Sequence, residues 1–217
     1  MCTFTTCIPG SKEEEKLEAV ADRSKVSVFS DGSGHEGGVG AATVFYRGRE
    51  EKHVLRKFLG SKEIHTVFKA ELLRLSLATE MLKGKTLVWS LTIGVNSQAV
   101  MQATRHRRAT PGQYLVEVFH NQIMAIWGKH PSIENTLRWM PGHAGIPGNK
   151  QVDEEAKWVA KGQSSVQSRL PMVCRNKLPF SWLAACQSHR KMVNNKMKKW
   201  FKTFVKGFRG SIHPCPC

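Results

Sequence analysis

Polar and apolar positions alternate along residues 26–33, which read Val-Ser-Val-Phe-Ser-Asp-Gly-Ser. β-Branched and aromatic residues at this spacing predict a strand that ends at Asp31. The glycine-rich residues 32–40 that follow are typical of a hairpin, and an aspartate beside a turn glycine has an ordinary structural explanation. This stretch alone predicts a strand and a turn, so later segments decide whether Asp31 has a chemical role.

The same periodicities predict four further strands and four helices. The strands are expected at 39–46, 53–59, 86–95 and 136–140, and the helices at 65–83, 96–104, 113–129 and 149–161. This order of elements predicts an α/β fold in three layers, with a five-stranded mixed sheet flanked by helices. Parallel pairing should begin at the fourth strand, where the connections become helical.

One carboxylate falls on the apolar side of a predicted helix. Glu71 lies between Phe68 and Leu75 in the stripe that helix 65–83 should turn toward the core. A buried carboxylate needs a partner. That partner is either a Lys or Arg in a core ion pair or a metal ion shared with another carboxylate.

Three further polar residues are expected near the sheet. Asp31 ends the first strand and Asn96 follows the fourth, and ligand sites of open α/β sheets gather at the carboxyl ends of strands. Asn96 is equally well explained as the N-cap of helix 96–104. Asp153 lies on the side of its helix that carries Ala156, near the positive N-terminal end, where small neighbours leave it accessible.

The charge of the chain favours a polyanionic partner. Its 217 residues have room for one domain and an appendage, and 41% of them are hydrophobic, which is enough for a core. Lys and Arg number 33 against 17 Asp and Glu, a net charge of +16, for which nucleic acid is a better match than a membrane. Residues 163–217 contain eleven basic residues and no acidic residue, so the positive charge is concentrated there.

Composition divides the chain into a polar lead-in at 1–24, a domain at 25–162, a linker at 163–180 and a basic helical tail at 181–217. The lead-in is expected to be disordered or to form a helical turn or two. The tail should form an amphipathic helix over 181–208, which fits nucleic acid, a membrane surface or a calmodulin-like groove. Docking onto the domain is a fourth option for this helix.

The six cysteines do not indicate a disulfide framework, since they lie at positions 2, 7, 174, 186, 215 and 217 without a C-x-x-C pair. His213, Cys215 and Cys217 lack a fourth ligand for a structural metal, so a frayed end is the better interpretation. No segment approaches the roughly 20 apolar residues of a membrane span. No leader sequence is recognisable, and we expect a soluble, intracellular protein in a reducing compartment.

Four motifs carry the most specific information. They are Ser30-Asp31-Gly32-Ser33, His65-Thr66-Val67-Phe68-Lys69-Ala70-Glu71-Leu72, Trp139-Met140-Pro141-Gly142-His143-Ala144-Gly145-Ile146-Pro147-Gly148-Asn149 and Val152-Asp153-Glu154-Glu155-Ala156. In this order they resemble ribonuclease H of type 1, and most closely the ribonuclease H domains at the C-terminal end of non-LTR retrotransposon polyproteins. The resemblance covers residues 25–162 and implies a ribonuclease H-like fold.

Two positions depart from the family pattern. Where the family has an aspartate in Asp-Ser or Asp-Asn-Gln-Ala, this chain reads Asn96-Ser97-Gln98-Ala99, so an amide replaces the third carboxylate. Lys150 stands where the family often has a glutamate, which adds positive charge near His143. Because the amide brings no charge to a metal site, we expect slow or absent cleavage.

The resemblance implies hydrolysis of the RNA strand of RNA–DNA hybrids to 5′-phosphates, with two Mg²⁺ ions roughly 4 Å apart and Mn²⁺ as an alternative. It implies that Asp31 contacts both ions, that Glu71 and the position of Asn96 serve one, and that Asp153 serves the other. His143 would transfer a proton or assist product release. The alternative is a catalytically inactive module that binds hybrids or other nucleic acid.

The resemblance also implies nucleic-acid contacts. Gly32, Ser33 and Gln98 would lie along the shallow minor groove of a hybrid, where 2′-hydroxyls are accessible. The basic run at Arg105, Arg107 and Arg108 suits either a solvated loop or phosphate contacts. Retrotransposon members of the family often carry a basic extension, so nucleic acid ranks first as the partner of the tail.

Two other interpretations are set aside. Trp127, Trp139 and Trp158 have apolar neighbours in the sequence and are expected to pack in the core rather than to stack on bases. A polynucleotidyl transferase or exonuclease of the same superfold is disfavoured by the 141–149 loop and by the order of the elements.

Overall fold

The computed structural model describes residues 5–7, 11, 26–48, 50–83, 90–105, 111–129, 131, 134–139 and 147–209. Within them, six strands form one sheet in the order β1-β6-β5-β2-β3-β4. They are β1 (Thr5–Cys7), β2 (Val26–His35), β3 (Gly38–Arg47), β4 (Glu50–Ser61), β5 (Ser90–Val95) and β6 (Glu134–Trp139). Strands β2, β3 and β4 pair antiparallel, whereas β2, β5, β6 and β1 pair parallel in turn. The five predicted strands and their mixed pairing are confirmed.

Strand β1 corrects the expectation for the lead-in. We predicted disorder or a helical turn, but Thr5–Cys7 pairs in parallel with residues 136–138 of β6. Without β1, strand β6 would be an edge with unpaired backbone groups. The Thr-Thr-Cys stretch can pair with it because threonine favours extended backbone. Residues 8–10 and 12–24 lie outside the described part of the chain.

Strand β2 continues past Asp31, where the sequence predicted its end. Its parallel pairing with β5 stops at Ser30 opposite Val95. Its antiparallel pairing with β3 extends to His35 opposite Gly38, because the hairpin continues along this side alone. Asp31 therefore marks the end of the parallel pairing and not the end of the strand.

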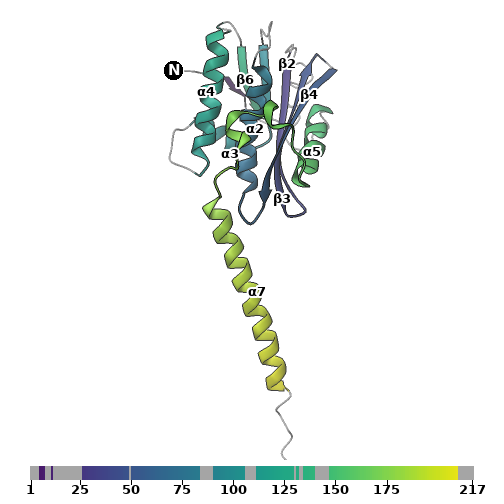
Figure 1. Cartoon of the computed structure of the whole chain (residues 1–217), viewed down its shortest axis with the longest axis vertical. Helices are drawn as coiled ribbons and strands as arrows, with labels where there is room; N and C mark the ends of the chain where they lie inside the picture. Colours follow the sequence, from purple (N-terminus) through teal and green to yellow (C-terminus); the bar gives the residue numbers. More distant parts are fainter. Residues whose placement is uncertain are drawn as a thin grey trace, which may run out of the picture.

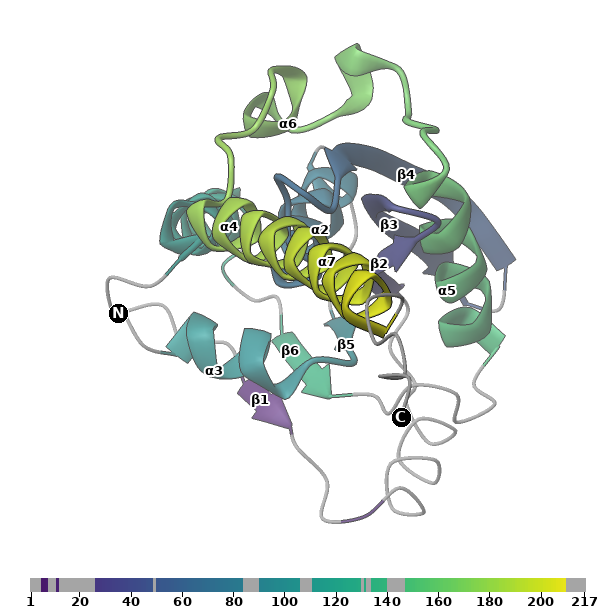
Figure 2. The ribbon, with the colours of Figure 1, turned by 90° about the horizontal axis from the view of Figure 1, so that it is seen from below.

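Helices cover both faces of the sheet, which gives the three predicted layers (Figure 2). One face carries α2 (Val67–Leu82), α3 (Gln98–Arg105) and α4 (Gln113–Lys129), and the other carries α5 (Pro147–Ala160). The main core lies between the first face and its helices, and α2 is buried along most of its length, as its apolar pattern predicted. A smaller apolar cluster joins α5 to the opposite face through Ala42, Val44, Val152, Ala156 and Val159.

Two glycines of β3 let α5 lie close to the sheet. A Cβ atom at Gly40 would lie 2.5 Å from a methyl carbon of Val159, and one at Gly38 would lie 1.9 Å from the carbonyl oxygen of Ala160. Any side chain at these two positions would push the helix outward. The glycines therefore help to set the position of the helix that carries Asp153.

Residues 163–180, which we expected to be a linker, pack onto the domain. They include η1 (Gln167–Arg169) and α6 (Met172–Arg175), and the main core contains their side chains Leu170, Cys174 and Leu178. The Ser165 N–H donates to the carbonyl oxygen of Arg56 over 2.9 Å, and the Arg56 N–H donates to the Ser165 hydroxyl oxygen over 3.0 Å. The polar composition suggested a linker, but three apolar side chains and the backbone of edge strand β4 hold the segment.

The basic tail forms one long helix, α7 (Trp182–Arg209), which projects away from the domain (Figure 1). Its first turn is anchored, since Ala184 is buried and the N–H of Ser181 donates to the carbonyl oxygen of Ile64 over 2.8 Å. Farther along, more than half of the surface of each of four large apolar side chains is exposed, at Met197, Trp200, Phe201 and Phe204. Among the described residues, no helix has both the length and the apolar character needed to cross a lipid bilayer.

Candidate active site

Asp31 and Asn96 meet at the carboxyl ends of adjacent parallel strands. Each directly follows the last parallel pair, which is Ser30 of β2 and Val95 of β5. The side-chain amide of Asn96 donates from Nδ2 to Oδ1 of Asp31 over 2.6 Å. The two side chains therefore share one edge of the sheet, as the strand order predicted.

A buried arginine joins this pair. Arg74, on α2, has no exposed side-chain surface. Its Nη1 donates to Oδ1 of Asn96 and to the carbonyl oxygen of Ser30, each over 2.6 Å, and lies 3.7 Å from Oδ1 of Asp31. Its Nε donates to the carbonyl oxygen of Glu71 over 3.0 Å. Asn96 is thus held between a guanidinium and a carboxylate.

The chemistry of these two partners fixes the orientation of the Asn96 amide. A guanidinium only donates hydrogen bonds, and an ionised carboxylate only accepts them. The amide must therefore turn its carbonyl to Arg74 and its NH₂ group to Asp31, as it does here. An aspartate at this position would place one carboxylate oxygen against another, so asparagine is the residue that completes this arrangement.

Burial dominates the electrostatics of Asp31. Its side chain is 9% exposed, and the loss of hydration raises its pKa above the usual value, against the opposing effects of Arg74 and of the hydrogen bond from Asn96. The charge of Asp153 raises the same pKa further, so these two acids are close enough to interact. Burial lowers the pKa of Arg74, but a guanidinium keeps its charge at any physiological pH.

Glu71 reaches the site because Gly32 has no side chain. A Cβ atom at Gly32 would lie 2.7 Å from the backbone nitrogen of Glu71 and 3.0 Å from its Cγ. The Glu71 side chain is half-buried, and its charge raises the pKa of Arg74. Of the two kinds of partner expected for Glu71, an arginine lies nearby, but its hydrogen bond goes to the backbone carbonyl of Glu71, and the partner of the carboxylate stays a prediction.

Asp153 enters the same region from α5. Its side chain is half-buried, and its Oδ2 accepts a hydrogen bond from Nζ of Lys157, one helical turn later, over 2.6 Å. This bond raises the pKa of Lys157, and the charge of Asp31 contributes to the same shift. Lys157 therefore adds a second positive charge near the carboxylates, although an exposed pair of this kind is weak and easily exchanged.

The donor set fits a divalent-ion site poorly. Hard divalent ions bind anionic oxygen atoms, and the resemblance implies such ligands at Asp31, Glu71 and Asp153. Here Oδ1 of Asp31 and the amide oxygen of Asn96 are already hydrogen-bonded, and a fixed positive charge lies 3.7 Å from the former. Among the described residues, no group of three or more His, Cys, Asp or Glu side chains is arranged to hold a metal ion.

The other predicted site residues are only partly described. On β2, Gly32 is buried against α2 and Ser33 is half-buried, whereas Gln98 and Arg105 on α3 are exposed. The remaining three, His143, Arg107 and Arg108, lie outside the described residues. The roles implied for all of these residues stay predictions.

Arg74 is the site residue that sequence reasoning missed. It stands between Leu73 and Leu75, in a helix predicted to be mostly buried, three residues after Glu71. A charged side chain in such a stretch must find a partner, which is the signal that could have identified it. The pattern indicated that an arginine or lysine could pair with Glu71 but did not identify Arg74.

Trp158 corrects the expectation that all three tryptophans pack in the core. Trp127 and Trp139 pack against the main core, but Trp158 is 60% exposed. It lines a hollow of about 550 Å³ on the outer side of α5, together with Arg56, Lys150, Gln151, Glu154 and Glu155. Only the side of α5 that carries Val152 meets the sheet, so a tryptophan outside that stripe stays at the surface.

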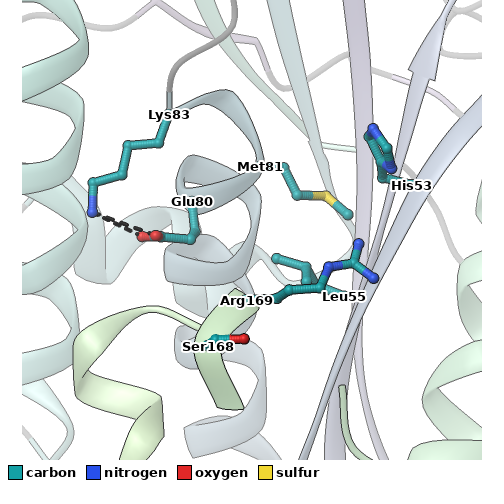
Figure 3. A pocket seen from close by; sticks show the side chains of 7 residues that line it. All are labelled: His53, Leu55, Glu80, Met81, Lys83, Ser168 and Arg169. Carbon is teal, nitrogen blue, oxygen red and sulfur yellow. Dashed lines mark hydrogen bonds and ion pairs between the residues drawn. The ribbon is translucent and has the colours of Figure 1, made fainter. Parts of the chain in front are cut away.

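A second hollow, also of about 550 Å³, shares no residue with the strand-end site (Figure 3). It lies where η1 packs beside β4 and the C-terminal end of α2, and it is lined by His53, Leu55, Glu80, Met81, Lys83, Ser168 and Arg169. Its acid, Glu80, is paired with Lys83 over 3.2 Å. The hollow results from the packing of the 163–180 segment, and we assign it no chemistry.

The chain belongs to the RNase H family, whose family model matches residues 23–161. This match covers the whole sheet except β1, together with α2 to α5 and the strand-end site. It confirms the resemblance at the level of the family. A search of curated proteins found no match.

Several solved structures are similar to the chain. One is LC11-RNase H1, isolated from compost by a metagenomic approach and solved in complex with an RNA/DNA hybrid (20% identity, TM-score 0.48, 63% of this chain and 97% of that chain). Others are RNase H1 of the halophilic archaeon Halobacterium salinarum (14%, 0.44, 64% and 98%) and the PFV RNase H domain (16%, 0.48, 65% and 98%). The assignment to the family rests on the family match.

Proposed function

We propose that this chain is an RNase H domain that binds RNA–DNA hybrids, and that its hydrolysis of the RNA strand is slow or absent. The observation that carries the proposal is the placement of Asn96, which is held between Arg74 and Asp31 where the family pattern has a third carboxylate. Family membership supports the hybrid as the ligand, and the net charge of +16 supports binding to a polyanion.

The charges of the site support binding without a metal ion. Asp31, Glu71 and Asp153 bring three negative charges, while Arg74 and Lys157 bring two positive charges within the same group of side chains. A phosphate approaching this edge of the sheet meets a site that is nearly neutral rather than strongly negative. Its binding therefore depends little on an added cation.

Two-metal hydrolysis with Mg²⁺ or Mn²⁺ is the alternative function. It is supported by the family and by the approach of three carboxylates to one edge of the sheet. The engaged oxygens of Asp31 and Asn96 argue against it. A non-LTR retrotransposon origin is a separate proposal, supported by the residues of the four motifs and by the basic extension.

The test combines binding and cleavage on one substrate. Anisotropy of a fluorescent RNA–DNA hybrid should show binding by the full chain in EDTA, with little change when Mg²⁺ is added. Gel analysis of the same hybrid in Mg²⁺ or Mn²⁺ should show an intact RNA strand. The matched control is Asp31→Asn, which removes the central carboxylate and separates cleavage by this site from cleavage by a contaminant.

Rapid RNA cleavage by the wild-type chain that disappears in Asp31→Asn would overturn the proposal in favour of the two-metal enzyme. Binding that requires Mg²⁺ would contradict the proposed independence from added cations. Equal cleavage by both proteins would identify a contaminant, and the binding measurement would then decide.

A further inference from the structure

We propose that Arg74 is a resident cation that neutralises Asp31 and excludes a divalent ion from it, with Asn96 as the matching neutral residue. This inference deepens the proposed function, because it names the residue that suppresses metal binding. It is carried by the contacts of one buried guanidinium with three groups of the site, Asn96, Ser30 and Asp31.

Asp31 needs a positive charge nearby. A carboxylate with 9% exposure loses most of its hydration and must be compensated within the protein or by a bound cation. The guanidinium of Arg74 lies 3.7 Å from Oδ1 of Asp31 and is itself fully buried. It provides that compensation at all times, since an arginine does not lose its proton.

The positive charge of Arg74 competes with a metal ion for Asp31. A divalent ion on Oδ1 of Asp31 would compete with the Asn96 N–H, and an ion on either oxygen would remain beside a fixed positive charge. Two cations in a poorly hydrated site repel each other strongly. Arg74 cannot swing away as an exposed lysine could, because its Nη1 and Nε also hold the backbone carbonyls of Ser30 and Glu71.

Arg74 makes a single substitution at position 96 insufficient for metal binding. The second terminal nitrogen of Arg74, Nη2, is buried without a hydrogen-bond partner in the described part of the chain. An aspartate at 96 would therefore meet a guanidinium with an unused donor, and the pair would become a charge-assisted contact. The new carboxylate would be bound by Arg74 rather than free to bind a metal ion, so both positions must change together before Mg²⁺ can bind.

The experiment measures metal binding in the absence of nucleic acid. Calorimetric titration with Mg²⁺ and thermal melts in EDTA and in Mg²⁺ are compared for the wild-type chain, Asn96→Asp, Arg74→Met and Arg74→Met/Asn96→Asp. The double variant should bind Mg²⁺ on the order of tenfold to hundredfold more tightly than Asn96→Asp and should gain thermal stability in Mg²⁺. The wild-type chain and both single variants should show little gain.

Two results would overturn the inference. One is an Asn96→Asp variant that binds Mg²⁺ as tightly as the double variant. The other is a wild-type chain that is stabilised by Mg²⁺ in a manner abolished by Asp31→Asn, which would place the ion beside Arg74. This second comparison keeps Arg74, so it decides the matter even if Arg74→Met does not fold. Failure of hybrid binding would overturn the proposed function without changing these metal titrations.

Discussion

The Nη1 atom of Arg74 lies 2.6 Å from the side-chain carbonyl oxygen of Asn96, and this contact ties helix α2 to the end of strand β5. Through the NH₂ group of Asn96 the connection continues to Asp31 on β2. Three elements therefore meet in one chain of hydrogen bonds at the carboxyl ends of the parallel strands. The same three residues link the stability of the domain to the site that we propose excludes divalent ions.

Removal of the amide should destabilise the domain. Asn96→Ala leaves the buried groups of Asp31 and Arg74 without their shared partner, and we expect a loss of about 1–3 kcal/mol in the free energy of unfolding. Urea unfolding followed by circular dichroism measures this loss. Asn194→Ala, on the exposed surface of α7, is the matched control and should be neutral. Equal stability of the two variants would show that the hydrogen-bond chain contributes little.

Asn96→Asp alone should leave hybrid cleavage low, because Arg74 would bind the added carboxylate. Gel analysis of a labelled hybrid in Mg²⁺ compares this variant with the wild-type chain. Cleavage that appears with this single change would show that the missing carboxylate is the sole defect of the site. Cleavage by the wild-type chain as well would retire the binding-module hypothesis.

Substitution of Gly32 should disturb the approach of α2. In Gly32→Ala the new Cβ would lie 2.7 Å from the backbone nitrogen of Glu71, so helix or strand must shift, and overpacking of this kind costs about 1–3 kcal/mol. The control is Gly34→Ala on the same strand. The new Cβ would lie 2.7 Å from a methyl carbon of Val67 and 3.9 Å from the carbonyl oxygen of Gly38. Urea unfolding should show the larger loss for Gly32→Ala, and a reversed order would contradict this packing.

Much of the fold could be predicted because the buried face of each strand or helix produces a regular apolar pattern within one stretch of sequence. The alternation in residues 26–33 predicted β2, and the apolar pattern of 65–83 predicted α2 and its burial. The predicted end of β2 at Asp31 was wrong because residues 32–35, Gly-Ser-Gly-His, have little strand propensity of their own. Their extended conformation comes from pairing with β3, and the pattern within residues 26–35 alone does not reveal this pairing.

The candidate site was predictable only in part. Parallel pairing brings the ends of strands together, so Asp31 and Asn96 could be placed at one edge. The reach of Arg74 could not be predicted, because a long side chain on a helix can extend in several directions. Its actual path depends on how closely α2 packs on β2, which is determined by Gly32.

The buried pair of His65 and Lys69 should make stability fall in acid. Burial, and then the charge of Lys69, lowers the pKa of His65 from 6.5 to about 4. Above pH 6.5 the imidazole is neutral in both states, whereas between 6.5 and 4 the unfolded chain binds a proton that the folded chain does not. The free energy of unfolding should therefore decrease as pH falls through this range, by at most about 1.4 kcal/mol per pH unit for this one proton.

Urea unfolding at several pH values measures this effect of His65. The free energy of unfolding is plotted against pH, and in His65→Gln the contribution of the imidazole to the slope between pH 6.5 and 4 should disappear. His189→Gln, which changes an exposed histidine of α7, is the matched control. A slope that is unchanged in His65→Gln would show that carboxylates alone cause the loss of stability in acid.

Removal of residues 186–217 should weaken hybrid binding and flatten its dependence on salt. These residues contain eight Lys or Arg and no acid. Residues 186–209 belong to helix α7, which projects from the domain. A chain that ends at Ala185 keeps the anchoring turn at Ser181 and Ala184. Each lost phosphate contact should reduce the slope of log K against log salt by about 0.9.

Anisotropy titrations over a range of salt concentrations test this, with Trp200→Ser/Phe204→Ser as a full-length control that retains every charge. An unchanged slope in the shortened chain would show that α7 does not contact phosphates, and a slope lost in the control would assign binding to its aromatic side chains.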